Sequence, residues 1–111
     1  MYNHIGFYLS QHVAQPLADE FGDRLERMTK AEKLLLINIL SGVLHELETT
    51  LVESYTAAEY IFMQGINLDV VGNLMPLLER FDEHDFSTNQ TIVMVLGLSL
   101  QDGGQSKKGD R

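Results

Sequence analysis

The sequence predicts an all-α fold, a compact bundle of about five helices, and three observations support this prediction. Apolar residues recur every three or four positions through most of the chain, which is the spacing of a helix buried on one side. Three segments carry the Ser/Thr-x-x-Glu/Gln pattern of an N-terminal capping box. Only the stretch 91–100 is rich enough in β-branched residues to suggest a strand, and no second strand-like run exists to pair with it.

The size and composition suit one domain with one hydrophobic core, because the chain has 111 residues of which 44% are apolar. The last ten residues are all glycine, polar or charged. We therefore expect a single helical domain over residues 1–101 and a flexible polar tail over residues 102–111.

The first half of the domain is predicted to contain three helices. One runs from about His4 to Ala14, and Pro16 begins a second, because the first turn of a helix tolerates the missing N–H of proline. Thr29 and Glu32 form the clearest capping box and begin a long helix that should reach about Glu53. The expected buried stripes are Leu17, Phe21, Leu25 and Met28 in the second helix and Leu36, Leu40, Val43, Leu47 and Leu51 in the third, whose opposite, polar face should carry Asn38, Ser41, Gly42, His45 and Thr49.

The second half begins with another capping box, Thr56–Glu59, and Gly65 is a natural end for the helix that this box begins. Asp69 is expected to cap the next segment, which Gly72 and Pro76 should interrupt.

The last predicted helix follows a third capping box, Ser87–Gln90, and spans the apolar stretch 91–100. The composition of this stretch also fits a strand, but an isolated strand would leave its backbone groups unpaired, so we predict a helix. The helix is apolar nearly all round. Such a helix lies at the centre of a core or packs against a second copy of the chain.

The charge distribution argues against several classes of partner. The net charge is −8, and no Lys or Arg occurs between Lys33 and Arg80, a span that holds six acidic residues. Nucleic acids and anionic membrane surfaces are recognised by clustered cations, so neither is expected as a partner. A basic protein surface remains a suitable partner.

The sequence also indicates a cytoplasmic protein. It contains no cysteine, the N-terminal residues do not resemble a secretion signal, and the longest apolar runs are too short to cross a bilayer.

No motif in the sequence predicts catalysis, a cofactor or a metal ion. No serine lies in a Gly-x-Ser-x-Gly elbow, and no glycine-rich phosphate loop occurs between a strand and a helix. His45 and Glu48 share a helix face and acidic residues surround His84, but a metal site needs three or four converging ligands. An enzyme or metal protein would need His12, His45 or His84 to converge with carboxylates, and we expect no such site.

One local motif points to a specific alternative. The segment Leu44–Leu51, Leu-His-Glu-Leu-Glu-Thr-Thr-Leu, resembles the H-box of sensor histidine kinases, in which an exposed histidine on a long helix of a dimeric bundle is phosphorylated. The resemblance implies that His45 is the phospho-acceptor, Glu46 the activating acid and Thr49 the group that positions water. Where that family has a basic residue and a proline, Glu48 and Thr50 stand here.

The function predicted first is that of a small acidic, non-enzymatic interaction protein, a regulator, adaptor or inhibitor. We expect it to form a homodimer and to bind another protein, because so small a chain cannot bury both its apolar last helix and its long two-faced helix alone. The alternative is a histidine phosphotransfer module that uses His45 and relays phosphate, since the sequence contains no glycine-rich ATP-binding motif.

Overall fold

The computed structural model describes residues 4–50 and 52–104, and within them all the regular secondary structure is helical. Five helices have seven residues or more, which confirms the predicted all-α bundle. A short 3-10 helix precedes them, and a four-residue helix followed by a second 3-10 helix lies between the third and the fourth. The elements are η1 (Ile5–Phe7), α1 (Gln11–Phe21), α2 (Lys30–Thr49), α3 (Ala57–Gln64), α4 (Leu68–Val71), η2 (Gly72–Leu74), α5 (Met75–Phe81) and α6 (Phe86–Gly104).

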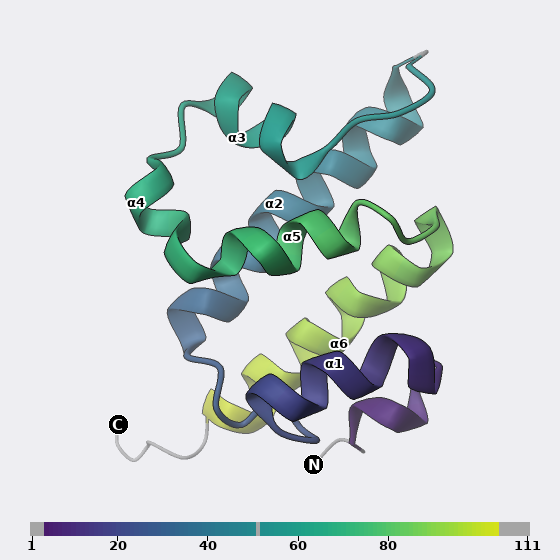
Figure 1. Cartoon of the computed structure of the whole chain (residues 1–111), viewed down its shortest axis with the longest axis vertical. Helices are drawn as coiled ribbons and strands as arrows, with labels where there is room; N and C mark the ends of the chain where they lie inside the picture. The colour runs from purple at the N-terminus through teal and green to yellow at the C-terminus, as the bar shows by residue number, and fades with distance from the viewer. Residues whose placement is uncertain (1–3, 51, 105–111) are drawn as a thin grey trace.

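The two longest helices, α2 and α6, pack against each other and form the centre of the fold. In Figure 1, α5 crosses in front of α2, while α3 lies at the opposite end of the molecule from η1. Helix α3 contacts both α2 and α5. The core draws on every helix, with the largest contributions from Leu36, Ile39, Leu40 and Val43 of α2, Leu77, Leu78 and Phe81 of α5, and Ile92, Val95 and Leu96 of α6.

The predicted helix over residues 91–100 is confirmed as the body of α6. Its apolar residues are covered mainly by this chain, since Ile92, Val95 and Leu96 are buried and Met94 alone among its large apolar residues is clearly exposed. The helix continues to Gly104, three residues into the predicted tail. The rest of that tail, residues 105–111, lies outside the described residues.

The predicted break at Pro16 is wrong. Helix α1 runs through Pro16, and the break lies earlier, between η1 and the N-cap residue Ser10. Burial explains the difference, because Val13, Leu17 and Phe21 lie on one buried face that spans the proline. Packing along this face outweighs the one backbone hydrogen bond that proline cannot make.

The predicted continuation of this helix to Met28 is also wrong, although Leu25 and Met28 are buried as expected. The helix ends at Phe21 because Gly22 takes a positive φ of 96°. Leu25, with a φ of 58°, then turns into the core. Neighbouring elements hold the loop in place: the Ile5 amide donates to the Asp23 carbonyl at 2.7 Å, and the Ser99 hydroxyl donates to the Arg24 carbonyl at 3.2 Å.

Helix α2 begins at the predicted capping box, in which Thr29 and Glu32 bond reciprocally. It ends at Thr49 rather than near Glu53, because Thr50 is extended. The Thr50 amide and hydroxyl both donate to the Glu46 carbonyl, the hydroxyl at 2.7 Å, and so close the last turn of the helix. Of the predicted stripe, the first three residues are buried and Leu47 is half-buried, whereas Leu51 lies outside the described residues.

At two helix N-termini the capping residue is a neighbour of the one predicted. The side chain of Asn67, not Asp69, caps α4 by accepting from the Asp69 amide at 2.8 Å. Asp85, not Ser87, caps α6 by accepting from the Thr88 amide at 2.8 Å. Both are short polar side chains that reach an N–H group two or three residues on. The capping box at Thr56 and the ends at Gly65 and Gly72 are as predicted, and Pro76 lies in the first turn of α5.

None of the helices in the described ranges has the length and apolar character required to span a membrane.

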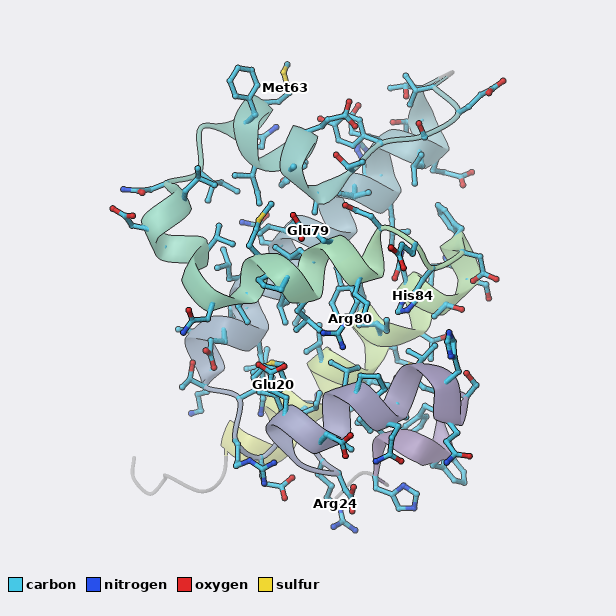
Figure 2. The ribbon with its side chains drawn as sticks, in the orientation of Figure 1. Glu20, Arg24, Met63, Glu79, Arg80 and His84 are labelled. Carbon is cyan, nitrogen blue, oxygen red and sulfur yellow. The ribbon has the colours of Figure 1, made fainter. Side chains whose placement is uncertain are left out.

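His84 lies at the turn between α5 and α6 (Figure 2) and packs on Phe81, with 5.8 Å between ring centroids. Its Nδ1 atom and the Oδ1 atom of Asn89 are both buried without a hydrogen-bond partner among the described residues. Burial lowers the pKa of His84, and the nearby charge of His12 lowers it further. The neighbouring Asn89 side chain and acidic residues oppose this lowering only in part. The fold therefore favours neutral His84.

We predict that protonation of His84 destabilises the protein. Its pKa is lower in the folded than in the unfolded chain, so the unfolded chain binds more protons, and stability falls as the pH drops below about 6.5. Urea unfolding at pH 7 and pH 5 should show a smaller loss of stability in His84→Gln than in the wild type. His45→Gln, which changes an exposed ring, should keep the wild-type loss. An equal loss in wild type and His84→Gln would contradict this assignment.

Candidate protein-interaction surface

Three large apolar side chains lie exposed near one another at the end of α3 and the start of α4. The exposed fractions are 82% for Phe62, 68% for Met63 and 65% for Leu68. Met63 lies at the outer end of α3 and points away from the rest of the molecule (Figure 2). We call these three residues the apolar patch. Single exposed apolar residues are common, whereas a group of them is a candidate binding surface.

The short length of α3 explains why Phe62 and Met63 point outward. The helix has eight residues, and its buried side consists of Ala57 and Ile61, one turn apart. Successive residues turn by about 100° around a helix, so the two residues that follow Ile61 point away from the core. The sequence Ile-Phe-Met therefore places one residue in the core and two on the surface.

The turn after α3 brings Leu68 to the same surface. Gly65 ends the helix in the left-handed conformation with a φ of 69°, and the Ile66 amide donates to the Ile61 carbonyl at 3.0 Å. This compact turn leads directly into α4, where Leu68 lines a groove together with Phe62.

Two open grooves flank a ridge on α3. Ala58 and Phe62, one turn apart, line both grooves and therefore form the ridge between them. The first groove has a volume of about 520 Å³ and the second about 570 Å³. The first, called here the acidic groove, is also lined by Glu46, Tyr55, Glu59 and Met63, and the second, called the apolar groove, by Ile61, Gly65, Ile66, Leu68 and Met75.

The two grooves differ in charge. Glu46 and Glu59 line the acidic groove, whereas the apolar groove has no ionisable lining residue. Burial, together with the charges of Glu46 and Glu59, raises the pKa of the Tyr55 hydroxyl. Glu59 Oε1 accepts from the amide and hydroxyl of Thr56, at 2.8 and 3.2 Å, and both donors are neutral. The capping box therefore fixes the Glu59 carboxylate without cancelling its charge.

Helix α3 is held on α2 by a close contact between Tyr60 and Gly42. A methyl group at Gly42 would overlap the Tyr60 ring, so only glycine allows this approach. The Tyr60 hydroxyl donates to Asn38 Oδ1 at 3.3 Å. Asn38, Gly42 and Glu46 follow one another at intervals of four residues, so they form one line along α2. The first two hold Tyr60, and the third lines the acidic groove.

This contact corrects the prediction that Gly42 lies on a polar, solvent-facing side of the long helix. Gly42 is half-buried under α3. The other four residues are exposed as predicted, although Asn38 also accepts a hydrogen bond from Tyr60 of α3.

A second contact fixes the start of α3. Asp82, at the end of α5, accepts from the Ala57 amide at 2.9 Å. Burial raises the pKa of Asp82, and the Ala57 amide opposes this rise. The N-terminus of α3 thus rests on α5 and its middle on α2, which gives the apolar patch a rigid base.

The structure places the three residues of the H-box resemblance along the last two turns of α2, but in different settings. His45 is exposed, whereas Glu46 is half-buried at the acidic groove. The Thr49 hydroxyl donates to the His45 carbonyl at 2.7 Å, so it is bound to the helix backbone rather than directed toward the imidazole. The role of His45 as a phospho-acceptor stays a prediction.

The other candidate ligands do not converge. Within residues 4–50 and 52–104, no group of three or more His, Asp and Glu side chains is arranged to hold a metal ion. His84, in the acidic turn, packs on Phe81 instead.

Comparisons of the chain with models of protein families, with curated proteins and with solved structures give no match.

The sequence contained two signals for this surface. An eight-residue helix with three consecutive large apolar residues, Ile61, Phe62 and Met63, cannot bury all of them on one side. The absence of Lys and Arg between residues 33 and 80 already marked the same region as acidic. What the sequence did not indicate is the proximity of Leu68 and Glu46 to Phe62, because that depends on how α3 packs.

We predict that Gly42→Ala destabilises the protein although alanine favours helix. The added methyl group must displace the Tyr60 ring at a cost of about 1–3 kcal/mol, against a gain in helix propensity of at most about 1 kcal/mol. Gly97→Ala is the matched control, because a methyl group at this helical position of α6 meets open space and should stabilise by up to about 1 kcal/mol. Urea unfolding measures both changes. Equal stabilisation by the two substitutions would show that α3 does not rest on Gly42.

Proposed function

We propose that this protein is a non-enzymatic interaction protein, a regulator, adaptor or inhibitor, that binds another protein through the apolar patch and the two grooves beside it. The single observation that carries the proposal is the exposure of Phe62 on a ridge between two grooves. Burying such an aromatic side chain on binding removes a large apolar area from water, and aromatic residues are common centres of binding energy.

The rigid base of α3 also supports this function. The contacts of Tyr60 with Gly42 and of Asp82 with the Ala57 amide hold the ridge in place before a partner binds. A preformed surface loses less conformational entropy on association than a flexible one, so more of the contact energy contributes to affinity.

The partner is a different protein whose contacting surface is basic. Glu46 and Glu59 line the acidic groove, whose lining includes no Lys or Arg, and the sequence has neither residue between positions 33 and 80. A second copy of the chain would bring the same acids against each other, which opposes a homodimer through this surface. The homodimer expected from the sequence thus requires another face, and it stays a prediction, as does the cytoplasmic location.

The test compares two aromatic residues at opposite ends of the molecule. Phe62 lies on the apolar patch, and Phe7, which is 67% exposed, belongs to η1 (Figure 1). Tagged wild type, Phe62→Ala and Phe7→Ala are used to capture proteins from a native lysate. We expect a partner that binds wild type and Phe7→Ala but is lost with Phe62→Ala, because removing a central aromatic anchor costs about 2 kcal/mol or more, a loss of roughly 30-fold in affinity.

Circular dichroism should show that both variants keep the wild-type melting temperature, since exposed positions contribute little to stability. Capture that is equal for the three proteins would contradict the proposed surface. Sedimentation of the purified wild type tests the homodimer separately, and a dimer that dissociates with Phe62→Ala would show that a second copy, not another protein, occupies the patch.

A further inference from the structure

The difference between the two grooves indicates what kind of segment fits them, on the assumption that the proposed function is correct. The acidic groove combines an apolar wall, Phe62 and Met63, with the carboxylates of Glu46 and Glu59. The apolar groove beyond the ridge offers only uncharged lining. A ligand that fills both must therefore present two different side chains, one on each side of Phe62.

A long basic side chain fits the acidic groove. The methylene stem of Lys or Arg packs on apolar surface while the charged group stays at the rim. Here the stem would lie along Phe62 and Met63, with the cation facing Glu46 and Glu59. Tyr55 adds an aromatic ring at the same groove, which favours Arg through cation–π attraction. Burial is the main cause of the raised pKa of Tyr55, and the negative charges of Glu46 and Glu59 add to it. The same two charges favour a bound cation.

An aliphatic or aromatic side chain fits the apolar groove, where Ile66, Leu68 and Met75 provide the contacts. A charged group there would lose its hydration without meeting an opposite charge, so the apolar groove selects against it. The two grooves thus require one basic and one apolar side chain from the partner.

A helix is the form of backbone that this surface accommodates. The described part of the chain has no strand, so it offers no sheet edge to pair with an extended segment. A helix bonds its own backbone groups and needs none from its partner. The ridge of Ala58 and Phe62 runs along the four-residue rows of α3, which is the kind of ridge that enters a groove between side chains of another helix. Side chains that flank such a groove lie three or four positions apart.

We infer that the partner binds through an amphipathic helix that places a Lys or Arg in the acidic groove and an apolar residue, three or four positions away, in the apolar groove. Phe62 then lies between the two side chains, and its burial completes the contact.

A selection from a displayed peptide library tests this pairing. The library contains helix-forming peptides about 16 residues long, near the length at which isolated helices become stable, with randomised positions on one face. Peptides are selected on the purified full chain and counter-selected on Phe62→Ala. We expect the enriched peptides to carry Lys or Arg three or four positions from Leu, Ile, Met or Phe.

The dissociation constants of the enriched peptides then show how much of the binding depends on the two carboxylates of the acidic groove. The double variant Glu46→Gln/Glu59→Gln should bind them roughly tenfold or more weakly, and this difference should shrink at high salt. Glutamine at position 59 keeps the capping box, so α3 stays intact. The control Glu83→Gln removes an exposed acid that lines neither groove and should bind as the wild type does.

Three results would overturn the inference, and they bear differently on the proposed function. Enriched peptides that depend on Phe62 but lack a basic residue, or that bind the double variant equally well, would refute the pairing and leave the interaction surface in place. Failure to enrich any helical peptide, together with Phe62-dependent capture of a protein from lysate, would refute the helical ligand alone. Failure of both experiments would refute the inference and the proposed function together.

Discussion

The packing of the Tyr60 ring on Gly42 is the contact on which the features of this surface depend. It lets α3 approach α2 more closely than any residue with a side chain at position 42 would allow, and Asn38 fixes the ring by accepting from its hydroxyl. Because α3 rests there, Glu46 of α2 reaches the same groove as Phe62 and Met63. The short turn at Gly65 then brings Leu68 of α4 to the groove that Phe62 also lines. A shift of α3 would separate the charged and apolar parts of the surface.

The surface combines two properties that oppose each other in an isolated protein. Three exposed apolar side chains favour association, while the acids around them and the net charge of −8 oppose self-association and favour solubility. A basic partner reverses the second effect, because the acids then attract it and speed its encounter with the surface. Apolar contact would supply most of the affinity, and charge complementarity would determine which partner binds.

The sequence predicted those parts of the fold that depend on local pattern. The capping boxes at Thr29 and Thr56 followed from residue spacing, and the helical state of residues 91–100 followed from the lack of a second strand-like run to pair with them. The errors arose where packing between elements decides. Burial of one face carried α1 through Pro16, and the core drew Leu25 inward after Gly22 had ended the helix. Gly42 was assigned to a solvent-facing side because no local pattern shows that Tyr60, eighteen residues later, covers it. For the same reason the sequence marked the acidic region but did not show that Leu68 and Glu46 lie near Phe62.

Oxidation of the methionines, read by mass spectrometry, tests the interaction surface most directly. Met63, on the apolar patch, is 68% exposed and reports on the surface. Met94 on α6, which is 47% exposed, and the buried Met28 are internal controls for an exposed and a protected methionine. Hydroxyl radicals should oxidise Met63 and Met94 in the purified protein and leave Met28 largely unreacted. In a complex with the captured partner, the proposed surface requires that Met63 becomes protected while Met94 reacts as before. Unchanged oxidation of Met63 in the complex would contradict it, and protection of Met94 instead would place the partner on α6.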